Sequence, residues 1–154
     1  MSAPVLPRVT RAGFIVVGVL PWILPFARAL LPLGRAGELL DLFFLPMCHR
    51  LPERTLALAG VSMPLCSRCA GIFAGLALGS LIQRPRVEIA RFRILVAGAG
   101  ALMLLDVVTQ DLGLHPVWHA TRIATGLLFG YALAAACLLA MRSAAGDAGA
   151  LGGP

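Results

Sequence analysis

Three of the four cysteines fall in one stretch of the chain, where they could bind a metal ion. Cys48 is followed directly by His49, and Cys66 and Cys69 form a C-x-x-C motif further on. Thiolate and imidazole groups are typical Zn²⁺ ligands in tetrahedral sites, and C-x-x-C is a usual half-site. The pattern predicts a zinc-type site built from the three cysteines and completed by His49 or Asp106. With three protein ligands alone, the open position would be catalytic in character.

The same cysteines could instead perform thiol–disulfide chemistry. A C-x-x-C motif at the N-terminal end of a helix stabilises a thiolate through the helix dipole and the free backbone N–H groups. On the outer side of a membrane, Cys66 and Cys69 could form a redox-active disulfide with Cys48 as an exchange partner. Alternatively, a bound metal or a disulfide could have a purely structural role and connect the outer loop to the helix bundle.

Arginines near these cysteines are candidates for binding an anion. Arg54, Arg68 and Arg122 could hold an anionic lipid headgroup or the phosphate of a lipid-linked substrate. Asp106 lies near the end of an apolar segment, where an ionisable group is costly and usually pairs or functions. Gln110 is one helical turn further on and is expected to orient a ligand or water. The simpler interpretation is an Asp106–Arg122 pair that locks two helices together.

The composition of the chain is that of a membrane protein. Of its 154 residues, 59% are hydrophobic and 13% are charged, whereas soluble domains are nearer one half and one quarter. All thirteen basic residues are arginine and the net charge is +6, but they fall mainly at the ends of apolar runs. Blocks of interleaved arginine and aromatic residues are absent, so nucleic-acid binding is not expected. Motifs of serine hydrolases and zinc proteases are also absent from the sequence.

The apolar runs predict an all-α fold, an integral membrane four-helix bundle. About 20 apolar residues are needed to cross the hydrocarbon layer. The predicted spans are residues 13–33, 65–82, 94–110 and 123–141. They form a single transmembrane domain, residues 13–142, between a cytoplasmic N-terminus, residues 1–12, and a disordered tail, residues 143–154. A cleaved signal peptide is the alternative for the first span.

Two further features predict how the bundle is assembled. Gly71, Gly75 and Gly79 recur every four residues, a spacing that lets a neighbouring helix approach closely. Residues 38–45 are too few to span but apolar on one side, which predicts a short interfacial helix in the first outer loop, ending at Pro46.

The arginines also predict the orientation. By the positive-inside rule, the N-terminus and residues 83–93 are cytoplasmic. The chain is then a multi-pass protein of the bacterial inner (cell) membrane with cytoplasmic N- and C-termini, and its cysteine site faces outward.

The motifs occur together and in an order that resembles a known family. The segments CHRLPERTL, MPLCSRCAGIFAGLALG, LDVVTQDLG and TRIATG resemble the small prokaryotic membrane proteins of domain-of-unknown-function family 2085, over roughly residues 48 to 130. The resemblance implies a polytopic membrane protein with a shared polar site, and it brings no activity. The corresponding positions are Cys48, His49, Arg54, Pro64, Cys66, Arg68, Cys69, Gly71, Gly75, Asp106, Gln110, Arg122 and Gly126. Asp111 and His119 do not clearly correspond to family positions.

Our leading hypothesis is therefore an outward-facing Cys/His zinc-type site with arginines beside it for an anionic ligand. Whether such a site makes an enzyme or a structural element is left open by the sequence. The competing hypotheses are a membrane thiol–disulfide oxidoreductase that uses Cys66 and Cys69, and a small transporter subunit. The transporter would need to form a homo-oligomer, because four helices enclose little room for a pathway.

Overall fold

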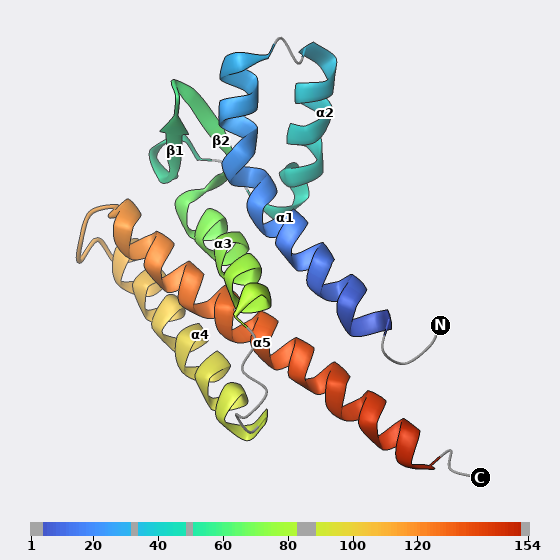
Figure 1. The fold of residues 1–154 in the computed structure, drawn as a ribbon. Helices are drawn as coiled ribbons and strands as arrows, with labels where there is room; N and C mark the ends of the chain where they lie inside the picture. The colour runs from blue at the N-terminus through green and yellow to red at the C-terminus, as the bar shows by residue number, and fades with distance from the viewer. Residues whose placement is uncertain (1–4, 32–33, 49–50, 83–88, 152–154) are drawn as a thin grey trace.

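The computed structural model is mostly helical, with one small β-hairpin (Figure 1). The structure describes residues 5–31, 34–48, 51–82 and 89–151. The elements, in order, are helices α1 (Val5–Leu30) and α2 (Gly34–Phe44), the 3-10 turns η1 (Leu45–Met47) and η2 (Pro52–Arg54), strands β1 (Thr55–Leu58) and β2 (Val61–Cys66), and helices α3 (Ser67–Leu81), α4 (Ile89–Asp111) and α5 (His119–Leu151).

Three of these helices, α1, α4 and α5, are long and apolar enough to cross a membrane. Helix α4 illustrates why they need lipid around them. Its side chains Ile94, Leu104 and Leu105 are 73%, 62% and 59% exposed, and large apolar groups exposed along a whole helix are stable in hydrocarbon, not in water. The predicted membrane fold is confirmed by this helical architecture.

Helix α3 is shorter than the span predicted at residues 65–82. It has 15 residues, about 22 Å at 1.5 Å per residue, against a hydrocarbon layer of about 30 Å. The reason lies in the preceding residues, because Val61–Cys66 form a strand and the helix starts only at Ser67. The described residues thus contain three helices of spanning length together with α3, so the four-span count stays a prediction.

The glycines of α3 form the face that packs on α5. A Cβ atom on Gly75 would collide with the carbonyl oxygen of Leu127 and lie 2.7 Å from the backbone nitrogen of Tyr131. A Cβ on Gly79 would lie 2.6 Å from the Tyr131 carbonyl oxygen. Glycines on α5 face the backbone of α3 in the same way, at Gly126 and Gly130. The two helices therefore pack backbone to backbone, as the four-residue glycine spacing predicted.

The β-hairpin was not predicted from the sequence, and it determines where Cys66 lies. Ala59 and Gly60 connect the strands with φ angles of +52° and +76°, and positive φ at both turn positions matches the twist of a tight hairpin. The register places Thr55 opposite Cys66. Arg54 is consequently brought next to the start of α3.

Helix α2 and a small apolar core hold this region against α1. Leu24, Phe44, Cys48 and Leu65 form a buried cluster that joins α1, the end of α2 and β2. The outer side of α2 is apolar and exposed, as at Leu39. The interfacial helix predicted at residues 38–45 thus coincides with part of α2, while its contact with a membrane surface stays a prediction.

The ends of the first and last helices differ from the predicted spans. Helix α1 begins at Val5, and α5 continues to Leu151 through the region predicted to be a disordered tail. Alanine, the best helix former, recurs in this final segment and supports its helical conformation. The start of α1 and the end of α5 lie at the same end of the bundle, opposite the turn between α4 and α5 (Figure 1).

Candidate metal and anion site

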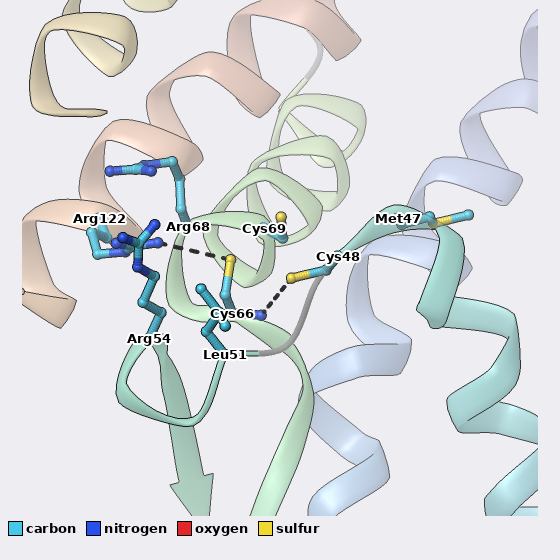
Figure 2. Close-up of a pocket in the computed structure, with 8 residues that line it drawn as sticks. All are labelled: Met47, Cys48, Leu51, Arg54, Cys66, Arg68, Cys69 and Arg122. Atoms are coloured by element: carbon cyan, nitrogen blue, oxygen red, sulfur yellow. Dashed lines mark hydrogen bonds between the residues drawn. The ribbon is translucent and has the colours of Figure 1, made fainter. Parts of the chain in front are cut away.

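Three free thiols meet at the N-terminal end of α3 (Figure 2). Cys48 follows η1, Cys66 ends β2 and caps α3, and Cys69 lies in the first turn of that helix. Their Sγ atoms all lie within 4.8 Å of one another. The backbone N–H of Cys66 donates a hydrogen bond to the Cys48 Sγ at 3.2 Å, and Cys48 is buried. The hairpin thus brings two segments, 18 residues apart along the chain, to one point.

The pKa of Cys66 is lowered by its neighbours. Hydrogen bonds with the thiols of Cys48 and Cys69 lower the pKa of Cys66 below its ordinary value, and the positive charge of Arg122 acts in the same direction. Partial burial opposes this shift without reversing it. The Arg122 Nη2 lies 4.0 Å from the Cys66 Sγ. The site therefore favours one thiolate surrounded by hydrogen-bond donors.

The spacing of the thiols suits a tetrahedral metal ion. With Zn–S bonds of about 2.3 Å, tetrahedral geometry requires sulfur atoms about 3.8 Å apart. Side-chain rotations that move the sulfur atoms by about 1 Å are therefore enough to bind the ion. Among the described residues, this cluster consists of the three cysteines. His49 lies outside the described residues, and the Asp106 carboxylate is engaged elsewhere, as shown below. The described part of the site thus offers three thiolate ligands for an ion.

A cavity of about 320 Å³ adjoins the thiols and is lined by three arginines (Figure 2). Its lining residues are Met47, Cys48, Leu51, Arg54, Cys66, Arg68, Cys69 and Arg122. The arginines come from η2, α3 and α5, three elements distant in sequence. Their convergence gives the cavity a positively charged wall next to the thiols.

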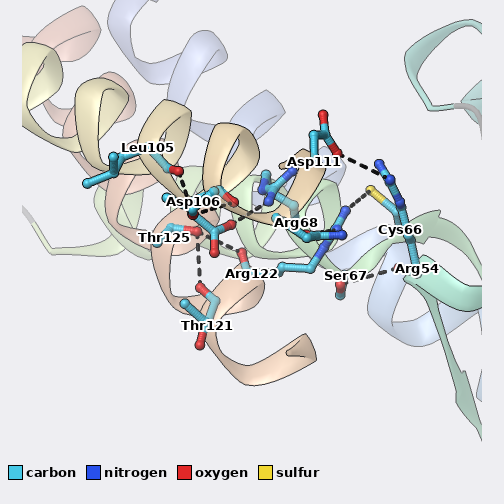
Figure 3. Close-up of polar contacts among 12 residues, drawn as sticks. Arg54, Cys66, Ser67, Arg68, Leu105, Asp106, Asp111, Thr121, Arg122 and Thr125 are labelled. Atoms are coloured by element: carbon cyan, nitrogen blue, oxygen red, sulfur yellow. Dashed lines mark hydrogen bonds and ion pairs between the residues drawn. The ribbon is translucent and has the colours of Figure 1, made fainter. Parts of the chain in front are cut away.

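Two of these arginines are held by polar residues of α4 (Figure 3). Arg68 forms an ion pair with Asp106, and both side chains are largely buried. Arg122 Nη1 donates to the Gln110 Oε1 at 2.7 Å. The sequence suggested an Asp106–Arg122 pair, and the structure pairs Asp106 with Arg68 instead. Asp106, predicted as an alternative metal ligand, is thus bound to a guanidinium and lies outside the cysteine cluster.

Arg54 has a partner that sequence reasoning did not assign. Its Nη2 lies 3.4 Å from Asp111 Oδ1, with 33% and 55% of the two side chains exposed. Its backbone carbonyl accepts a hydrogen bond from the buried Ser67 Oγ at 3.3 Å. The sequence did contain a signal that Asp111 lies near the site, because it directly follows Gln110 at the end of the same helix.

The histidines of the turn between α4 and α5 are not part of the described cysteine cluster. His115 accepts or donates a hydrogen bond at 2.9 Å with Thr109 and stacks on Trp118. His119 begins α5, where its Nδ1 is buried without a hydrogen-bond partner among the described residues. Cys137 lies in the C-terminal half of α5, also outside the cluster.

Sequence reasoning missed the apolar side of the cavity. Met47 and Leu51 line it together with the thiols and arginines, and they are 47% and 42% exposed. No pattern of spacing marks such residues, because they follow from the path of η1 and the chain leading into η2.

Comparison of the sequence with known proteins identifies the family of this chain. The family model described as "Predicted membrane protein (DUF2085)" matches residues 48–136, which include the three cysteines and the three arginines of the site. An uncharacterized protein of Methanocaldococcus jannaschii is 30% identical over 89 residues, covering 55% of this chain and 57% of that protein. An uncharacterized protein of Methanothermobacter thermautotrophicus is 34% identical over 91 residues, covering 57% of this chain and 81% of that protein. No solved structure matches the chain. The matched segment is more than half of the sequence and carries the cysteine and arginine motifs, so the chain belongs to the DUF2085 family of predicted membrane proteins.

Proposed function

We propose that this membrane protein binds a zinc-type metal ion through Cys48, Cys66 and Cys69 and holds an anionic ligand beside it. The observation that supports the proposal is the convergence of three free thiols within 4.8 Å of one another. Thiolates select soft or borderline ions such as Zn²⁺ over Mg²⁺ or Ca²⁺. The arginine wall of the adjoining cavity supports the anionic ligand.

Each residue of the site has a defined part in this proposal. Cys66, whose pKa is lowered by its thiol neighbours, supplies the first thiolate, and Cys48 and Cys69 complete a three-sulfur set. The fourth position is taken by water, by the anionic ligand or by His49. A bound ion would polarise an oxygen at that position. Gln110 positions Arg122 through its side-chain oxygen and thereby sets where the anion sits relative to the ion.

The predicted orientation gives the site its location. If both termini are cytoplasmic, as the arginine distribution indicates, the thiols and arginines face the outer side of the cell membrane. Ligands then reach the site from the outside or from the outer leaflet.

Elemental analysis of the detergent-purified protein tests the metal directly. We expect about one zinc per chain, with thiols that react with a titrant only after chelation or unfolding. Cys48→Ala, Cys66→Ala and Cys69→Ala should each lose the metal. Cys137→Ala is the matched control, because it removes a cysteine of α5 outside the cluster, and it should keep the metal. Metal-free protein with three freely reactive thiols would contradict the proposal.

The second candidate function is a thiol–disulfide oxidoreductase. Its specific support is that Cys66, with its lowered pKa, caps α3 and Cys69 follows within its first turn, the arrangement of a reactive thiolate with a resolving partner. In this case, the purified protein would be free of metal. It would contain a Cys66–Cys69 disulfide that a dithiol reductant opens. Cys69→Ala would then trap a mixed disulfide on Cys66, which a metal site does not predict.

A further inference from the structure

The three arginines that line the cavity share one unusual feature. Arg54, Arg68 and Arg122 each have a buried Nε–H without a hydrogen-bond partner among the described residues. Arg122 is only 2% exposed. Buried donors are nearly always satisfied in folded proteins, by protein groups, water or a ligand. Three such donors around one cavity indicate a missing acceptor with several oxygen atoms.

The charges around the cavity indicate that the acceptor is an anion. Arg68 and Arg54 are balanced by Asp106 and Asp111, whereas Arg122 donates to the neutral oxygen of Gln110. Even if the Cys66 thiolate at 4.0 Å balances part of this charge, the Arg122 Nε–H is left without an acceptor. The Nε and Nη groups of an arginine form a fork that matches two oxygens of a phosphate.

Two apolar side chains also line the cavity. Met47 and Leu51 line the cavity and are substantially exposed. In Figure 2 the thiols lie between the arginine head groups and Met47. Leu42, Phe43 and Leu45, which precede Met47 along α2 and η1, are also exposed. A ligand in the cavity therefore meets both charged and apolar side chains.

We infer that the ligand is an anionic phospholipid, with its phosphate on the arginines and its apolar chain across Leu51 and Met47. The membrane around the protein supplies such amphiphiles, and two exposed apolar side chains, Met47 and Leu51, line the cavity. This inference rests on the anionic ligand of the proposed function and assigns that ligand's chemical class.

Titration calorimetry of the purified protein in a non-ionic detergent separates lipid from free phosphate. The probes are dihexanoylphosphatidic acid, its chain-free counterpart glycerol 3-phosphate, inorganic phosphate, and dihexanoylphosphatidylcholine with its zwitterionic headgroup. We expect phosphatidic acid to bind at least about tenfold more tightly than the other three. Burying two or three methylenes suffices for that factor over the two chain-free probes, and charge-assisted contacts with the arginines favour it over zwitterionic phosphatidylcholine.

Variants of the arginines and of the apolar lining residues test the phosphate contact and the chain contact separately. Arg54→Gln, at a partly exposed arginine, should weaken the binding of phosphatidic acid and of glycerol 3-phosphate alike, by about tenfold. Arg122→Gln should do the same and provides a second variant at the buried position. Arg93→Gln, at an exposed arginine near the start of α4, is the matched control and should change nothing. Leu51→Ser with Met47→Ser should remove the advantage of phosphatidic acid and leave glycerol 3-phosphate binding as it was.

Each other outcome contradicts the inference in a distinct way. Equal binding of inorganic phosphate or glycerol 3-phosphate would make the ligand a free anion. Equal binding of phosphatidylcholine, which carries a phosphate but no net charge, would show that the site does not select an anionic headgroup. If no probe binds to samples that contain zinc, the lipid inference fails and the metal site stands. If the samples contain no zinc yet bind phosphatidic acid through Arg54, the metal proposal fails and the lipid site stands.

Discussion

The carboxylate of Asp106 on α4 forms an ion pair with Arg68 on α3, and the two side chains are only 7% and 11% exposed. Arg68 lies next to Cys69 in the first turn of α3, so the pair fixes the helix that carries Cys69 against α4. Helix α4 packs mainly on α5. The Arg68–Asp106 pair is therefore a polar link between α3 and α4 at the level of the site.

Breaking this pair on one side should strongly destabilise the protein. Asp106→Ala leaves the Arg68 guanidinium buried without its counter-charge, which typically costs about 3–5 kcal/mol. Asp111→Ala removes the partner of Arg54 from an exposed pair, worth at most about 1 kcal/mol. Unfolding of both variants in mixed micelles with increasing dodecyl sulfate gives the two free energies.

A double variant separates the loss of the Arg68–Asp106 attraction from the cost of leaving the Arg68 charge buried without a partner. Arg68→Met combined with Asp106→Leu should recover most of the stability that Asp106→Ala loses, because well-packed apolar residues often replace a buried pair without net cost. Equal losses for Asp106→Ala and Asp111→Ala would show that burial of the Arg68–Asp106 pair does not contribute as argued.

The elements predicted best are those whose sequence period matches a helix face. Gly71, Gly75 and Gly79 share one face at four-residue spacing, which was enough to predict a close helix contact. Asp106 and Gln110 share a face for the same reason, and both contact arginines of the site. Within one helix, spacing fixes which residues lie together.

The features missed depend on contacts between elements. Which arginine pairs with Asp106 is decided by how α3 and α5 lie beside α4, and the sequence pattern does not contain that information. The hairpin was missed because its turn is Ala59–Gly60, and alanine does not signal the positive φ that it adopts there. Without the hairpin, residue 65 looked like the start of a helix, although the helix begins two residues later at Ser67.

The close packing of α3 on α5 predicts a large difference between two glycine substitutions. Gly75→Ala places a methyl group against the carbonyl oxygen of Leu127, and such overpacking costs about 1–3 kcal/mol. Gly98→Ala, in α4, meets nothing within 4 Å and should be neutral or stabilise the helix by up to about 1 kcal/mol. Both are measured by the same dodecyl sulfate unfolding. A Gly75→Ala protein as stable as Gly98→Ala would contradict backbone contact between α3 and α5.

The lowered pKa of Cys66 predicts how its alkylation depends on pH. Iodoacetamide reacts with the thiolate, so the rate falls as the pH drops through the pKa of the folded protein. An ordinary cysteine loses half of its rate near a pH of about 8.5. For chelator-treated native protein, we expect the midpoint for Cys66 to lie below that value, because hydrogen bonds with Cys48 and Cys69 stabilise the thiolate. Mass spectrometry of the labelled peptides follows Cys66 separately.

The cause of the shift can be tested by removing its largest contribution. Cys48→Ala deletes the first of these hydrogen bonds, so the Cys66 midpoint should move up toward its ordinary value. Arg122→Gln removes a weaker electrostatic contribution and should move it less. Protein unfolded in dodecyl sulfate provides the reference, since all of these interactions are lost there. A native midpoint at or above that reference would mean that burial of Cys66 outweighs its hydrogen bonds, and the cluster would then lack the preformed thiolate that the redox chemistry requires.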